Sequence, residues 1–132
     1  MHQKNPMEFG YFFHMPPFPV LININGYLYG AKDKKSLINI FKRFLDITED
    51  QTHAVIDPTG KEWTLLVIDR KVVISPININ KWTKEQTVNL FNMRKNRNSE
   101  HGRIYSLKSL SARTKMKIME DLVYILEEEN KK

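Results

Sequence analysis

The chain has 132 residues, of which 41% are hydrophobic and 27% are charged, a composition typical of a globular domain with its own core. It contains no cysteine, which excludes disulfide scaffolds, thiolate zinc sites and thiol nucleophiles. No P-loop, dinucleotide fingerprint or nucleophile elbow occurs. The histidines have no recognised metal-binding spacing, so we predict neither a metal nor a cofactor; they are His2, His14, His53 and His101.

The first 19 residues are rich in proline and aromatic side chains. Glu8 and four prolines interrupt any apolar run there, so the segment does not have the pattern of a secretory signal. No apolar run elsewhere approaches the length of a membrane span. We therefore predict an aromatic arm over residues 1–19, followed by one domain over residues 20–132, in a soluble, cytoplasmic protein without a membrane partner.

Alternation of apolar and polar residues predicts a first strand over Val20–Tyr29, bent at Gly26. Asp33 is a good N-cap for a helix that we expect to reach about Leu45. Three further strands are expected between residues 53 and 76. The first two are joined by a type I turn, because an aspartate, a proline and a glycine occupy its preferred positions at Asp57, Pro58 and Gly60.

Two more helices are predicted in the C-terminal third. Thr83 and Gln86 form a capping box at the start of one. The other is expected to begin at Ser109 or Ser111 and to end at Glu129. The sequence therefore predicts an α+β fold: an antiparallel sheet of about four strands in the order β-α-β-β-β-α-α, with helices packed on it.

The letters ININ occur twice, at residues 22–25 and 77–80, and each copy is followed by a helical pattern. The spacing to that pattern differs by five residues between the copies, and Pro76 disrupts strand pairing before the second one. Two partial matches fall short of a sustained repeat. Chance recurrence in a chain rich in isoleucine and asparagine is therefore favoured over duplication.

The net charge of +6 is concentrated in one stretch. Residues 94–117 contain eight basic residues and one acid, so the rest of the chain carries a small negative charge. A local patch indicates an anionic partner more strongly than a diffuse excess does. The expected contact residues are Arg94, Lys95, Arg97, Arg103, Lys108, Arg113 and Lys117.

The order of charges along the last predicted helix adds to this argument. Arg113, Lys115 and Lys117 lie near its start and three glutamates lie at its end, the reverse of what the helix dipole favours. Local helix stability therefore does not account for the pattern. Helical projection places Arg113, Lys117 and Tyr124 on one side, and Tyr105 could add a stacking face.

These patterns leave three functional hypotheses open. The first is a non-catalytic binding protein that contacts an anionic partner, most plausibly the backbone of RNA or DNA. The second is an accessory protein that binds an acidic protein through the same basic residues, or binds its partner through the aromatic arm. The third is a small hydrolase or nuclease, which would need His14 and His53 close to Asp57 or Asp69. We favour a non-enzymatic role and assign no catalytic residue.

Overall fold

A short turn divides the first predicted strand into a hairpin. The computed structural model describes residues 8–9, 15–48, 52–68, 71–76, 80–97 and 103–130. In it, β2 (Val20–Ile24) and β3 (Tyr27–Ala31) pair antiparallel, with Ile24 opposite Tyr27. Asn25 and Gly26 both have positive φ, 55° and 93°, as a type I′ turn requires. The prediction of one bent strand is therefore wrong, because Asn-Gly reverses the chain here.

The remaining strands extend this hairpin into one sheet. They are β4 (Thr52–Ile56), β5 (Glu62–Ile68) and β6 (Lys71–Ser75), and the antiparallel order is β6-β5-β4-β2-β3. The two-residue β1 (Glu8–Phe9) pairs parallel with β6. The α+β class, the meander and the predicted element order are confirmed, but the antiparallel strands number five rather than four.

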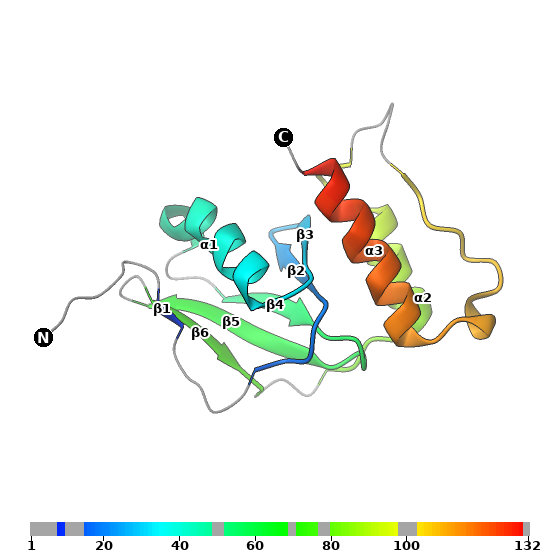
Figure 1. Ribbon diagram of the computed structural model, residues 1–132, viewed down its shortest axis with the longest axis horizontal. Coiled ribbons are helices and arrows are strands. Elements are labelled where there is room, and N and C mark those ends of the chain that lie inside the picture. Colours follow the sequence, from blue (N-terminus) through cyan, green and yellow to red (C-terminus); the bar gives the residue numbers. More distant parts are fainter. Residues whose placement is uncertain are drawn as a thin grey trace, which may run out of the picture.

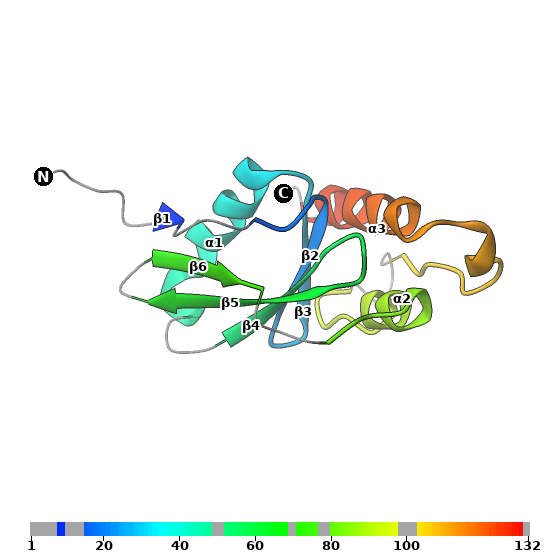
Figure 2. The ribbon, with the colours of Figure 1, turned by 90° about the horizontal axis from the view of Figure 1, so that it is seen from below.

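Three helices cover the two faces of the sheet (Figures 1 and 2). They are α1 (Lys34–Thr48), α2 (Lys84–Asn92) and α3 (Lys115–Glu129). Alternate residues of β2 point to opposite faces, so Val20, Ile22 and Ile24 pack with α1, whereas Leu21 packs with α2 and α3. The fold thus has two hydrophobic cores, one on each face.

Side-chain caps fix where the helices begin. Asp33 accepts a hydrogen bond from the Ser36 amide at 2.9 Å at the start of α1. The capping box predicted at Thr83 and Gln86 is present. The last helix begins later than predicted, because Thr114 is its cap and residues 110–112 form a separate 3₁₀ turn. Among the described residues, no helix is long and apolar enough to cross a membrane.

The structure bears in part on two further predictions, the aromatic arm and the repeated ININ segment. In the predicted arm, Pro16 is buried and Phe18 packs against the core under α1. The first ININ copy forms the end of β2 and the first turn residue. Residues 77–79 of the second copy lie outside the described residues, so the duplication remains untested.

His53 on β4 is a buried titratable group in the core under α1. It lies opposite Leu65, it is 6% exposed, and its Nε2 has no hydrogen-bond partner among the described residues. Burial lowers the pKa of His53 below its ordinary value of 6.5, because the cation cannot be solvated there. The neutral form is therefore the one that the fold accommodates.

We expect this histidine to make stability depend on pH. Its pKa is lower in the folded than in the unfolded chain, so its contribution is present above about pH 6.5 and is lost as pH falls. Urea unfolding at about pH 7.5 and pH 5.5 should show a loss on the order of 1 kcal/mol in the wild type and a smaller loss in His53→Leu. Equal losses in the two proteins would contradict this assignment.

Candidate anion-binding surface

The turn of residues 94–97, predicted to be part of an exposed basic surface, binds the β2–β3 hairpin. The Lys95 amide donates to the Gly26 carbonyl at 2.9 Å. The Asn96 side chain accepts from the Leu28 amide at 3.0 Å and donates to the Leu28 carbonyl at 2.9 Å. This segment therefore attaches the end of α2 to the outer strand of the sheet. The Lys95 side chain remains exposed above the hairpin turn.

Arg94 points inward rather than toward a partner. Its side chain is 0% exposed, and Nη2 forms an ion pair with Glu129 at 2.7 Å. Nη1 donates to the carbonyls of Phe91 and Arg103 at 2.8 and 3.2 Å. The guanidinium also lies 4.0 Å from the centre of the Phe91 ring. Arg94 thus joins the ends of α2 and α3, and its charge is compensated inside the protein.

The segment of residues 103–113 runs beside α3 and is held in place by side chains of α2 and α3 (Figure 1). The Asn92 amide group bonds both the N–H and the C=O of Tyr105, at 2.8 and 3.0 Å. Glu129 accepts from the Arg103 amide at 3.1 Å, and Lys84 donates to the carbonyl of Leu110 at 3.2 Å. These bonds position the segment without using its own basic side chains.

An open groove of about 400 Å³ lies between this segment and α3. We call it the basic groove. It contains two of the predicted arginines, two tyrosines and one acid. Its lining consists of Arg103, Ile104, Tyr105, Ser106, Arg113, Asp121, Tyr124 and Ile125.

Tyr105 and Arg113 both line the basic groove and contact each other. The Arg113 guanidinium carbon lies 5.3 Å from the centre of the Tyr105 ring, and the phenol donates to Asp121 at 2.5 Å. Burial and the hydrogen bond to Asp121 raise the pKa of Tyr105 to about 12. The phenol is therefore neutral at physiological pH, and the pair presents a cation on an aromatic plane.

The other predicted cations lie in three settings. Arg103 and Lys108 are exposed, and no bond of their side chains to another described residue is seen. Lys117 is also exposed, and its ammonium pairs with Asp121 at 3.2 Å. Arg97 is half-buried beside Arg94. The structure thus brings Arg103, Arg113 and Lys117 to one side of the protein, whereas the Arg94 side chain is buried and paired with Glu129.

Tertiary contacts account for part of the reversed charge order of α3. Glu129 binds Arg94, Lys117 binds Asp121, and Lys115 donates to the carbonyl of Thr59 at 3.2 Å. The partners of Glu129 and Lys115 lie outside the helix, whereas Lys117 and Asp121 form an i,i+4 pair within it. A local helical pair therefore partners Lys117, and tertiary structure supplies the partners of Lys115 and Glu129 that the sequence did not reveal.

Both carboxylate oxygens of Asp57 accept hydrogen bonds in the turn between β4 and β5 and from Trp63. One carboxylate oxygen accepts from the Thr59 amide, the Thr59 hydroxyl and the Lys61 amide, at 2.6 to 3.1 Å. The other accepts from Trp63 Nε1 at 2.9 Å. A hydrolytic pair with His53 would have to compete with all four bonds. His14 and Asp69, the other residues that the hydrolase hypothesis requires, lie outside the described residues.

We expect Arg94→Met to destabilise the protein by about 3 kcal/mol, because it leaves Glu129 and two carbonyls without their buried partner. Arg103→Met is the matched control, and it should cost no more than about 0.5 kcal/mol because that side chain is exposed. Urea unfolding monitored by tryptophan fluorescence measures both. Similar losses in the two variants would show that Arg94 is not a structural residue.

The site is therefore an open surface of cations and aromatic rings on a well-anchored segment. Among the described residues, no three histidine or acidic side chains are grouped as metal ligands. The residues that sequence reasoning missed are Asn92 and Asp121, whose roles depend on contacts distant in sequence. No protein-family model, curated protein or solved structure matches the chain.

Proposed function

We propose that the protein is a non-catalytic binding protein that binds single-stranded nucleic acid in the basic groove. The observation that carries the proposal is the arrangement of the Arg113 guanidinium on the Tyr105 ring, with Tyr124 61% exposed on the same groove. Proteins that bind single strands without reading sequence combine backbone cations with aromatic faces on which bases stack. Both components are present here within one groove.

Phosphate contacts would come from cations whose side chains remain accessible. Arg103, Lys108 and Lys117 are exposed around the groove and its anchored segment. Asp121 does not oppose them strongly, because its carboxylate is occupied by Tyr105 and Lys117. Arg94 is left out of the proposed contact set because its charge is internally paired.

A single strand fits this surface better than a duplex does. The aromatic rings of the groove would meet exposed base faces, which a duplex keeps stacked inside. A surface that bound an acidic protein through charge alone would not require an exposed aromatic side chain such as Tyr124. This tyrosine therefore distinguishes the proposed partner from a general polyanion.

Salt dependence tests the phosphate contacts. Fluorescence anisotropy with labelled oligonucleotides of about 12 nucleotides should give an affinity that falls about 20-fold between roughly 50 and 200 mM salt if three phosphates are contacted. The variant Arg103→Ser/Lys108→Ser/Lys117→Ser should lose most of the binding. Lys35→Ser/Lys42→Ser/Lys81→Ser removes the same charge from exposed positions elsewhere and should retain it.

Abasic oligonucleotides test the stacking contribution separately. The wild type should bind them at least about fivefold more weakly than normal single strands, whereas Tyr124→Ala should bind both equally. No binding at low salt, or equal losses in the two triple variants, would overturn the proposal. Equal affinity of the wild type for polyglutamate and oligonucleotides would instead indicate an acidic protein partner.

A further inference from the structure

The outer edge of β3 is open at one position between α1 and α3. In an antiparallel hairpin, alternate residues turn their N–H and C=O groups away from the partner strand. Leu28 does so, since Asn96 binds both of its groups. Gly30 is two residues farther along and must face the same edge. Among the described residues, no bond to its outward groups is seen.

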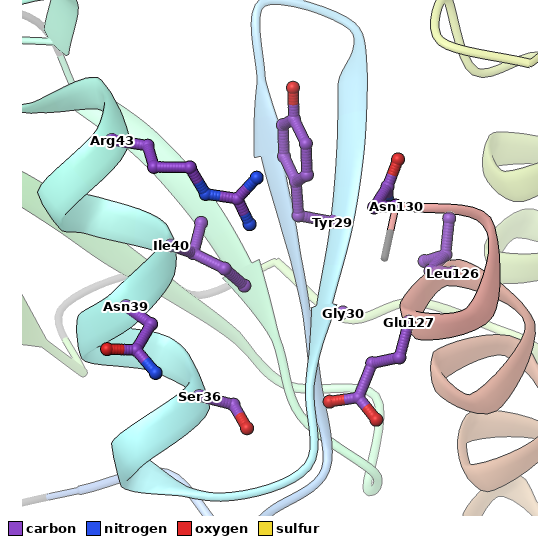
Figure 3. Close-up of a pocket in the computed structure, with 9 residues that line it drawn as sticks. All are labelled: Tyr29, Gly30, Ser36, Asn39, Ile40, Arg43, Leu126, Glu127 and Asn130. Atoms are coloured by element: carbon purple, nitrogen blue, oxygen red, sulfur yellow. The ribbon is translucent and has the colours of Figure 1, made fainter. Parts of the chain in front are cut away.

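A cavity of about 180 Å³ lies at this open position (Figure 3). Ser36, Asn39 and Arg43 line it from α1, and Glu127 of α3 and Asn130, the residue that follows this helix, line it from the other side. The cavity is therefore lined by polar side chains and by the unpaired main chain of a strand.

The cavity continues into a wider groove of about 800 Å³. The two share Ser36, Asn39 and Glu127, and the wider part reaches Lys32, the first residue after the end of β3. We call the combined space the edge groove. On the sheet side it is lined by Tyr29, Gly30 and Lys32, and Asn96 occupies the neighbouring edge position at Leu28.

Gly30 itself explains how α3 lies so close to this edge. A Cβ atom on Gly30 would lie 3.0 Å from the Cα of Val123 and 3.1 Å from its methyl groups. The absence of a side chain lets the helix pack directly on the strand, so that α1 and α3 form two walls about the cavity that Gly30 lines.

The walls of the edge groove favour a basic ligand. Three glutamates of α3 line it, and among the described residues Lys32 is the only cation lining its wider part. Arg43 lines the inner cavity, where its charge acts on the phenol of Tyr29. Tyr124 separates this acidic surface from the basic groove on the other side of α3. The glutamates are Glu120, Glu127 and Glu128.

From this geometry we infer that the edge groove binds a short extended peptide segment with basic side chains. Its main chain pairs with Gly30 and then Lys32 as an added strand, and its basic side chains lie against α3. Closure at Leu28 limits the pairing to a few residues. The inference concerns a surface distinct from the basic groove, so it does not depend on nucleic-acid binding.

The test uses the peptide acetyl-Lys-Val-Thr-Val-Lys-amide and the full chain in ¹⁵N NMR. In the free protein, the Leu28 amide should exchange with solvent more slowly than the Gly30 amide, because Asn96 protects it. Addition of peptide should shift the Gly30 and Lys32 amide signals and slow exchange at Gly30 by about tenfold or more.

Two controls separate main-chain pairing from charge attraction. A peptide N-methylated at its three central amides cannot donate to the strand and should lose binding. Glu127→Lys should weaken binding about tenfold, whereas Glu85→Lys at an exposed position of α2 should leave it unchanged. The inference is wrong if the N-methylated peptide or a glutamate-for-lysine peptide binds equally well, or if Gly30 is already as protected as Leu28.

Discussion

The turn of residues 94–97 is the contact on which the arrangement of the second layer depends. It binds the hairpin through the Gly26 carbonyl and both main-chain groups of Leu28. Through Arg94 it also binds the end of α3 and the carbonyl of Arg103. Because one short segment contacts the sheet, α2, α3 and the segment that follows, displacement of this turn would disturb both grooves.

Helix α3 is the common wall of two surfaces of opposite charge. Asp121 and Tyr124 face the segment of residues 103–113, where arginines predominate, while Glu120 and Glu127 face α1. The glutamates on the α1 side of α3 would repel a polyanion. A nucleic-acid strand would therefore remain on the basic side of the helix, up to Tyr124. The two proposed ligands have opposite charges and could occupy their grooves together.

Local patterns predicted most of the fold, but not the site. The capping box at Thr83 and the turn at Asp57 depend on neighbours in sequence and were predicted correctly. The Asn25–Gly26 hairpin carried an equally local signal that was misread as a bend. Ser109 and Thr114 are both good caps, and only packing decides between them. The burial of Arg94 could not be predicted, since it depends on Glu129, 35 positions away.

The amide of Asn96 has a consequence for how copies of this chain meet. A free edge strand normally offers a row of main-chain groups on which an identical strand can pair, and this is a common route to aggregation. Here one asparagine side chain takes the place of a neighbouring strand at Leu28, and it shortens the available ladder to the few positions between the helices. A second β3 strand therefore finds too little edge for a continuous sheet, which favours the monomer in a crowded solution.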